Sequence, residues 1–340
     1  MSGEAFVVGT GLIGASIGAA LRAAGWTAIG WDPSPDALEA AQKMGSLDGT
    51  GESVEDGAGA DLVVLAAPVG AIVATLTDLS TDALVTDVAG VKASVVAAAA
   101  HLPHFVGGHP MAGRESSGPG AASAAMFQGA SWILTTDGAD AVDLDRMDAI
   151  VRSMGATPIR MAAARHDAAV AAVSHVPQVM ASALVNLVAT DIDALSLAAG
   201  GFRDVTRIAL SEPAWWTDIL TANRADVAGL IRRLSADLSA WASLIAADDK
   251  QGVTAGLDSA RATRRGLAPS VAAVQVLLED RPGEIARVGN ALAETGVDVR
   301  DLQLRHATRG GGGVLTLSVQ PGQENALTEA LQAEGFRLVP

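Results

Sequence analysis

The sequence predicts an α/β protein with three successive parts: a doubly wound domain with a parallel sheet, an all-α block and a small α+β module. Three observations support this. A glycine-rich turn between a strand and a helix opens the chain, a long apolar helical stretch occupies the middle, and four strands alternate with two helices near the end. They divide the 340 residues into domains at 1–163, 164–266 and 270–340.

Composition excludes several classes of protein. The chain has 23 basic and 38 acidic residues, a formal net charge of −15, which argues against a nucleic-acid partner. It has no cysteine, and its six histidines show no metal-ligand spacing. The start enters a strand without a signal-peptide pattern, and the apolar run 62–76 is broken and too short to span a bilayer. We therefore expect a cytoplasmic protein with no metal ion, no membrane and no nucleic acid.

The first domain begins with a strand–turn–helix–strand unit. A strand over 5–8 leads into a G-x-G-x-x-G turn, a helix over 12–24 and a strand over 27–31 that ends at Asp32. Parallel α/β domains of the Rossmann type bind dinucleotides with this order of elements. The turn residues predicted to contact the cofactor are Gly9, Thr10, Gly11, Leu12, Ile13 and Gly14.

Individual positions in this unit indicate the cofactor. Gly9 and Gly11 allow a tight turn and close approach of a pyrophosphate, and Gly14 lets the helix pack on the strand. Asp32 would accept hydrogen bonds from a ribose 2′-hydroxyl, and no arginine follows it. This combination favours NAD over NADP.

Strands and helices continue to alternate through the rest of the first domain. The expected strands span residues 61–66, 84–87, 105–107, 132–135 and 157–161. The carboxyl ends of parallel strands line the cofactor crevice. Ala67 and Pro68 follow one of these strands and Asp87 ends the next, so these three residues are further predicted cofactor contacts.

The glycine-rich segment 107–118, GGHPMAGRESSG, is predicted to be a loop at the carboxyl edge of the sheet. Its composition suits a segment whose backbone and one imidazole, that of His109, approach a ligand closely. A histidine that only caps its own loop is the structural alternative.

The later parts of the chain differ in periodicity. A long helix is expected over 166–189, and further helices begin at Glu212-Pro213 and span 220–246 and 250–265. After Pro269 the order strand, helix, strand, strand, helix, strand indicates a ferredoxin-like module with a hairpin at 310–313.

Five motifs together resemble the prephenate/arogenate dehydrogenase family of tyrosine biosynthesis. They are VVGTGLIGASIG (7–18), VTDVAGVK (85–92), GGHPMAGRESSG (107–118), AVSHVPQ (172–178) and GGFRDVTRIALSEPAWWTDI (200–219). This resemblance covers about residues 1–265. The remaining module, with DRPGEIARVGNALAETGVDV (280–299), resembles an ACT domain.

The resemblance implies oxidation of the ring carbinol of prephenate with NAD, and loss of the ring carboxylate as CO2 to give 4-hydroxyphenylpyruvate. His109 matches the family's catalytic histidine, which would take the hydroxyl proton. Arg207 matches its carboxylate-binding arginine, whose fork of donors suits two hydrogen bonds. The other residues implied on the substrate side are His175, Gln178, Ser117 and Trp216.

Structural alternatives remain for these residues. Arg207 could form a salt bridge with Asp204 or Glu212, and Trp216 could serve packing alone. Trp215 is expected in the core. Lys92 is retained from the family pattern, but the sequence assigns it no role.

Two departures from the family pattern leave the substrate open. Gly90 stands where the family has a serine that contacts the reacting centre, and Gln178 stands where a second histidine is common. Prephenate and arogenate therefore both remain candidate substrates, and Glu115 is a candidate acceptor for the ammonium group of arogenate. A non-catalytic sensor of NAD and an amino acid is the alternative from another class.

The ACT-like module implies control by an amino acid, with L-tyrosine as the expected effector. The predicted allosteric residues are Asp280, Gly283, Glu284, Ile285 and Asp298. A dimerisation module without a ligand is the alternative. From the resemblance of the helical domain we also expect a homodimer.

Overall fold

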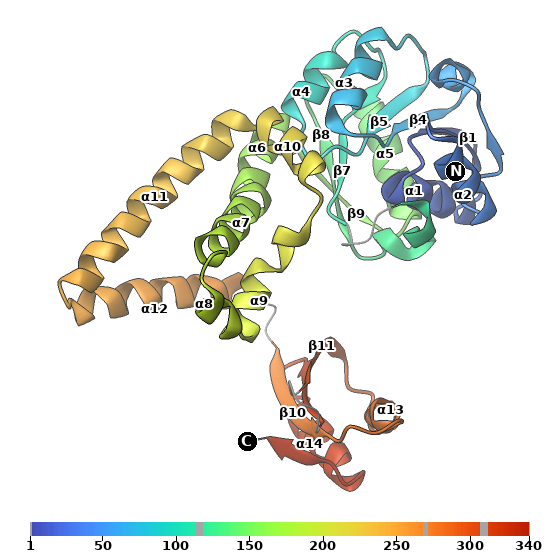
Figure 1. The fold of residues 1–340 in the computed structure, drawn as a ribbon. Helices are drawn as coiled ribbons and strands as arrows, with labels where there is room; N and C mark the ends of the chain where they lie inside the picture. The colour runs from blue at the N-terminus through green and yellow to red at the C-terminus, as the bar shows by residue number, and fades with distance from the viewer. Residues whose placement is uncertain (1, 113–117, 268–270, 307–311, 340) are drawn as a thin grey trace. The chain divides into compact units, whose positions relative to one another are not determined.

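The computed structural model describes residues 2–112, 118–267, 271–306 and 312–339 (Figure 1). The chain forms two compact units, Met1–Asp237 and Leu238–Pro340. The division falls within the helix α11 (Arg224–Ala246).

The first unit contains a six-stranded parallel sheet in the order β3-β2-β1-β4-β5-β6. Its strands are β1 (Glu4–Val8), β2 (Thr27–Trp31), β3 (Gly49–Thr50), β4 (Leu62–Leu65), β5 (Leu84–Asp87) and β6 (Phe105–Val106). The central strands β4 and β5 are buried at every position, as expected for a sheet covered on both faces. The order reverses between β1 and β4, the point at which doubly wound sheets bind ligands.

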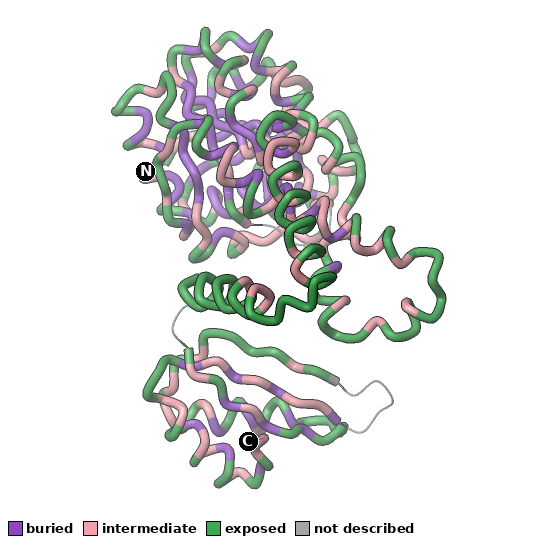
Figure 2. Tube along the Cα trace, turned by 90° about the vertical axis from the view of Figure 1, so that its left-hand side faces the viewer, coloured by how far each residue is buried: buried purple, intermediate pink, exposed green. Residues whose placement is uncertain are grey.

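Helices cover both faces of this sheet, and the buried residues gather around it (Figures 1 and 2). The helices are α1 (Leu12–Ala23), α2 (Pro35–Lys43), α3 (Val69–Asp78), α4 (Ala93–Ala98) and α5 (Ala141–Ser153). Short 3-10 turns lie between them: η1 (Val54–Gly59), η2 (Pro119–Ala121) and η3 (Ala124–Phe127). Successive residues of β1 point to opposite faces of the sheet. Val7 belongs to one apolar cluster with Ile17, and Phe6 belongs to another with Ile72. This confirms the predicted doubly wound domain.

A second, three-stranded sheet follows in the order β7-β8-β9. It consists of β7 (Gly108–Pro110), β8 (Ser131–Thr135) and β9 (Thr157–Met161), and β7 runs antiparallel to β8. The prediction of a loop is therefore wrong at 108–110. Glycine permits this strand, because a Cβ at Gly108 would lie only 2.5 Å from the carbonyl oxygen of Asp87. The pattern GGHP contains no apolar alternation that would have revealed it.

The rest of the first unit is helical. Its elements are α6 (Ala163–Val170), a π-helical turn η4 (Ala171–His175), α7 (Val176–Val188), α8 (Ile192–Ser196), α9 (Gly200–Thr206), a 3-10 turn η5 (Arg207–Leu210), α10 (Pro213–Ala222) and the start of α11. The single helix predicted over 166–189 is thus interrupted by a π-turn. By length and composition alone, the run Ala163–Val188 could cross a bilayer. However, His166 and Asp167 within this run form hydrogen bonds with His109 and with the backbone of Lys92, as residues of a core helix do.

The second unit contains the end of α11, the helix α12 (Lys250–Leu267) and a βαββαβ module. The module consists of β10 (Ala272–Leu278), α13 (Glu284–Thr295), β11 (Val299–His306), β12 (Gly313–Val319), α14 (Glu324–Ala333) and β13 (Arg337–Val339). Its sheet is antiparallel, in the order β11-β12-β10-β13. Val288, Leu317 and Leu327 belong to the apolar cluster that joins both helices to the sheet. The predicted ferredoxin-like module is confirmed, although positions 310 and 311 of its expected 310–313 turn lie outside the described residues.

Candidate active site

The glycine turn after β1 forms a cradle for a dinucleotide. Gly9 has a φ of +91°, and a Cβ there or at Gly14 would collide with a backbone oxygen, of Ala66 and Gly9 respectively. At Gly11, by contrast, an added Cβ meets no atom within 4 Å. The helix α1 starts there without a side-chain cap, so its first N–H groups face the open cradle. The turn therefore fits a pyrophosphate at the helix N-terminus.

Asp32 lies at the end of β2 beside this cradle. Its carboxylate accepts hydrogen bonds from the Thr10 backbone N–H at 2.7 Å and from the Ser34 backbone N–H at 2.9 Å. These bonds hold the acid against the glycine turn, in the position suited to a ribose. Ala67 and Pro68 follow β4 on the other side of the switch point.

Asp87 has a different role from the predicted cofactor contact. It is fully buried with Lys92, and the two form an ion pair. The Asp87 carboxylate also accepts hydrogen bonds from the backbone N–H groups of Ala89 (2.8 Å) and Gly108 (3.1 Å). Lys92 donates in addition to the Gly108 carbonyl at 2.6 Å. The pair thus connects the end of β5 to the strand β7, which carries His109. This is the structural role of Lys92, to which the sequence assigned none.

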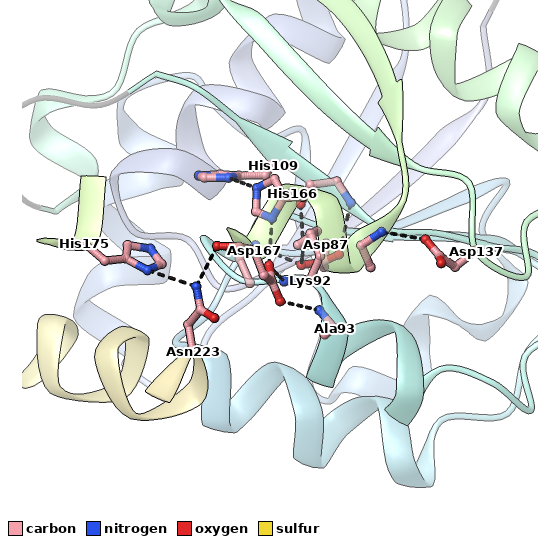
Figure 3. A network of polar contacts seen from close by, with 12 residues as sticks. Asp87, Lys92, Ala93, His109, Asp137, His166, Asp167, His175 and Asn223 are labelled. Atoms are coloured by element: carbon pink, nitrogen blue, oxygen red, sulfur yellow. Dashed lines mark hydrogen bonds and ion pairs between the residues drawn. The ribbon is translucent and has the colours of Figure 1, made fainter. Parts of the chain in front are cut away.

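His109 is part-buried on β7 and bonded to a second histidine (Figure 3). Its Nδ1 lies 2.8 Å from Nε2 of His166, and Nδ1 of His166 lies 2.8 Å from the Asp167 carboxylate. The backbone N–H groups of Lys92 and Ala93 hold that carboxylate at 2.7 and 2.8 Å. Three side chains from two regions of the sequence therefore form one continuous chain of hydrogen bonds.

The π-turn brings a third histidine to the same region. Nδ1 of His175 lies 3.2 Å from Nδ2 of Asn223, which also donates to the Asp167 carbonyl at 2.8 Å. The Trp216 ring stands edge-on to the His175 ring, with their centroids 6.1 Å apart. The structure thus links the predicted residue His175 to Asp167 through Asn223 (Figure 3), and the predicted Trp216 lies against His175. Trp215, expected in the core, is 54% exposed, because α10 turns Trp216 rather than its neighbour inward.

The electrostatics of this site favour neutral imidazoles. Burial, and then the nearby Lys92 ammonium, hold the pKa of His109 well below its usual 6.5. Burial also lowers the pKa of His175. Burial alone would raise the pKa of Asp167, but hydrogen bonds from His166, Ala93 and Lys92 outweigh it and lower that pKa. At neutral pH the His109 imidazole is therefore neutral, and the Asp167 carboxylate, which is linked to it through His166, is ionised.

Gly90 lies directly against the other edge of the His109 ring. A Cβ at Gly90 would be 3.8 Å from Nε2 of His109 and 3.8 Å from Cδ1 of Ile219 on α10. The position where the family has a serine thus borders the imidazole nitrogen that His166 does not occupy. A Cβ would fit there without a clash.

The remaining predicted substrate residues differ in what surrounds them. Gln178 is buried on α7, and its Oε1 has no hydrogen-bond partner among the described residues. Arg207 begins η5, which packs on α7, and its side chain is exposed. Ser117 and Glu115 lie outside the described residues.

Sequence reasoning missed three members of the site: His166, Asp167 and Asn223. The only local signal was the adjacent His-Asp pair at the start of a helix. Apart from the bond between the neighbours His166 and Asp167, their contacts join residues that lie 48 to 75 positions apart along the chain. No group of three or more His, Asp or Glu side chains in the described ranges could hold a metal ion.

The ACT-like module has its own charged site. Glu284 accepts hydrogen bonds from Arg281 and Arg287, both at 2.9 Å, and the bond from Arg281 is the largest cause of its lowered pKa. These three residues and Asp280 line a cavity of about 560 Å³. Of the other predicted allosteric residues, Gly283 has a φ of +92° and caps α13, Ile285 is exposed, and Asp298 pairs with Arg300.

Family models match almost the whole chain. Residues 17–160 match the nucleotide-binding domain of prephenate dehydrogenase, residues 162–259 its dimerization domain, and residues 272–336 an ACT domain. A probable prephenate dehydrogenase of Streptomyces niveus, NovF, is 34% identical over 96% of each chain.

Two solved structures share the fold and appreciable sequence. The prephenate dehydrogenase of Aquifex aeolicus, in complex with hydroxyphenyl propionate and NAD+, is 30% identical with a TM-score of 0.73. The match covers 78% of this chain and 98% of that one. The arogenate dehydrogenase of Synechocystis is 29% identical with a TM-score of 0.69, over 78% of this chain and all of that one.

Proposed function

Because the chain belongs to the prephenate dehydrogenase family, we propose that it oxidises prephenate to 4-hydroxyphenylpyruvate and CO2 in L-tyrosine biosynthesis. It is an NAD-dependent dehydrogenase. The open cradle at Gly11 and the acid at Asp32 are the features of this chain that suit NAD.

One observation carries the proposal: His109 is a neutral imidazole with one nitrogen bonded inside the protein and the other beside the space at Gly90. In this role, Nε2 of His109 accepts the proton of the ring hydroxyl. NAD, when bound, would supply the nicotinamide ring that accepts the hydride. The ring C–CO2 bond breaks, CO2 leaves, and the electron pair of that bond makes the ring aromatic and leaves a negative charge on the ring oxygen. That oxygen then takes the proton back from Nε2 of His109, which gives the hydroxyl group of the product and restores the neutral imidazole.

The substrate side of the site is assigned by position and chemistry. Arg207 would hold a substrate carboxylate through its guanidinium fork. His175 and Trp216, which lie edge-on to each other, would border the substrate. Ser117 and Gln178 would donate hydrogen bonds to it.

Gln178 favours arogenate as a second candidate substrate. Its carboxamide oxygen is buried and accepts no hydrogen bond from any described residue, and buried acceptors usually have a donor. Arogenate carries an ammonium donor where prephenate carries a keto group. The keto substrate would instead use the amide N–H of the same side chain.

Initial rates of NADH formation with prephenate and with arogenate test the assignment. We expect turnover with prephenate, and turnover with arogenate alone would replace it by the second candidate. His109→Ala should lower kcat by about 10²–10⁴-fold while NAD still binds. Lost NAD affinity with an unchanged kcat would refute the role of His109 as base.

Arg207→Ala tests the carboxylate site. The variant should raise KM strongly, since a charge-assisted pair is worth about 1.5–3 kcal/mol, roughly 10- to 100-fold in affinity. Arg203→Ala, on the neighbouring helix α9, is the matched control. An unchanged KM in Arg207→Ala would contradict the role.

The remaining assignments concern assembly and control. We propose a cytoplasmic homodimer, supported by the match to a dimerization domain. L-Tyrosine is the proposed effector of the ACT domain, with Asp280, Gly283, Glu284, Ile285 and Asp298 near its site. Activity measured with added L-tyrosine and then L-phenylalanine tests this, and no response to either would leave a dimerisation role.

A further inference from the structure

The hydrogen bonds behind His109 determine where its proton lies. Asp167 is the fixed end of the chain: its Oδ1 accepts the Lys92 N–H and faces Nδ1 of His166, while its Oδ2 accepts the Ala93 N–H. These donors keep Asp167 ionised, and an ionised carboxylate can only accept hydrogen bonds. Nδ1 of His166 must therefore carry a proton.

The remaining protons follow from the chemistry of neutral imidazole, which has one N–H and one acceptor nitrogen. With its proton on Nδ1, His166 offers an acceptor at Nε2. Nδ1 of His109, 2.8 Å away, must then donate to it. The lone pair of His109 is consequently on Nε2, the atom that borders Gly90.

We propose that His166 and Asp167 are positioning residues that hold His109 in the Nδ1–H tautomer, so that Nε2 presents its lone pair as the base. The catalytic consequence of this tautomer rests on the proposed function. When Nε2 takes the substrate proton, the new imidazolium keeps its Nδ1–H bond to His166. The positive charge is then stabilised through His166 by the Asp167 carboxylate.

One other arrangement fits the same distances. A cationic His166 would donate from both nitrogens, so that His109 accepts at Nδ1 and carries its proton on Nε2. Among the described residues, the charged groups near His109 are Lys92, paired with Asp87, and Asp167; His175 is neutral. The second arrangement has one more proton, on Nε2 of His166, and it places the His109 proton on Nε2 instead of Nδ1.

Nitrogen NMR distinguishes them without any turnover. The holoenzyme is labelled with ¹⁵N in its histidine rings, and His109→Gln assigns the His109 signals. At pH 7.5 we expect a protonated Nδ1 and an unprotonated Nε2 at His109. A protonated Nε2 would overturn the proposal, whereas absence of turnover with prephenate would refute the proposed function and leave this result unaffected.

Asp167→Asn tests the catalytic consequence. The amide can donate where the carboxylate only accepted, so it permits the wrong tautomer of His166. In a serine protease triad the same exchange lowers kcat about 10⁴-fold. Here we expect at least a ~10²-fold fall in kcat with KM changed less than about threefold, and a protonated Nε2 at His109 by NMR. An unchanged kcat would overturn the proposal.

A matched control pair lies elsewhere in the same domain. His104 is partly exposed and Asp143 is buried, and they form a pair with the same 2.8 Å distance from Nδ1 to the carboxylate. No hydrogen bond among the described residues joins this pair to His109. Asp143→Asn should leave kcat unchanged. An equal loss of kcat in Asp143→Asn would show that the Asp167 effect is not specific, and would overturn the proposal.

His166 variants keep the test valid if Asp167→Asn does not fold. In His166→Gln the side-chain oxygen can still accept the Nδ1–H of His109, whereas His166→Leu offers no acceptor. The glutamine variant should therefore retain at least about tenfold more kcat than the leucine variant, the effect of one hydrogen bond of about 1.4 kcal/mol. Equal kcat values would contradict the positioning role.

Discussion

The glycine turn after β1 and the segment that leads into β7 both depend on glycine, but in opposite ways. At Gly11 the glycine leaves a cradle in which an added Cβ touches nothing within 4 Å. At Gly107 and Gly108 the glycines let polar groups close in, because a Cβ would lie 2.7 Å from the Thr135 hydroxyl or 2.5 Å from the Asp87 carbonyl. The space at Gly11 is open and fits a ligand, whereas the space at Gly107 and Gly108 is filled by other atoms of the protein.

This difference predicts how each region responds to change. The filled region contains the buried charges of Asp87 and Lys92, so losing one partner leaves the other unpaired. The open region contains backbone N–H groups at the start of α1 that no side chain caps. An added methyl group there should therefore weaken ligand binding more than it lowers the stability of the fold.

Lys92→Met should produce the largest loss of stability. Removing the ammonium leaves the Asp87 carboxylate buried without its cation, which costs about 3–5 kcal/mol. Urea unfolding measures it. Lys43→Met is the control, because its pair with Glu39 is exposed, and it should unfold like the wild type. A wild-type midpoint for Lys92→Met would refute the contrast.

Gly11→Ala and Gly9→Ala separate binding from folding within one turn. Gly11→Ala should raise the Kd for NAD by about tenfold or more, with an unchanged melting temperature, because the methyl group fills only the cradle. Gly9→Ala should lower the melting temperature as well, because of its positive φ and its collision with Ala66. Calorimetric titration and thermal unfolding give both quantities; equal melting temperatures for the two variants would contradict the distinction.

The pH profile of kcat/KM tests the filled region without mutation. The proposed base must be unprotonated, so activity should be constant at neutral pH and fall as the pH drops through the pKa of His109. Burial and Lys92 hold that pKa well below 6.5, so half of kcat/KM should be lost only below pH 6.5. A midpoint above 6.5 would contradict the assigned environment.

Gly90→Ser should have the smallest effect. Its Cβ would lie 3.8 Å from Nε2 of His109 without a clash, so stability should stay as in the wild type. The hydroxyl adds one hydrogen bond near the reacting atoms, worth a rise in kcat of up to about tenfold. Gly90→Ala provides the same volume without the hydroxyl, and an equal effect from both variants would refute the role of the hydroxyl.

The fold was largely predictable from the sequence, because its signals are local. The strands Thr27–Trp31, Leu84–Asp87 and Thr157–Met161 have the predicted bounds, since apolar runs between turn residues define them. The strand Gly108–Pro110 was not predictable, because its pairing with β8 depends on space that glycine creates rather than on an apolar pattern.

The candidate site was predictable only in part. His109 and Asp32 belong to motifs whose chemistry is visible in the sequence. The bond from His109 to His166 joins residues 57 positions apart, and the burial of Asp87 follows from tertiary packing. Neither spacing nor composition encodes such contacts, so an acid predicted to contact the cofactor proved to be one half of a buried ion pair.

The π-turn Ala171–His175 has a consequence for how this site tolerates changes in chain length. A π-turn holds one more residue than the α-helical turn it replaces, and each residue advances an α-helix by about 100°. Deleting one residue from Ala171–Ser174 would let the segment close as a regular turn while α7 keeps nearly the same rotation relative to α6. An added residue that continued as α-helix would instead turn α7 by that angle, so His175 would turn away from Asn223 and Gln178 would leave its buried position. The site should thus tolerate one lost codon in this segment better than one gained codon.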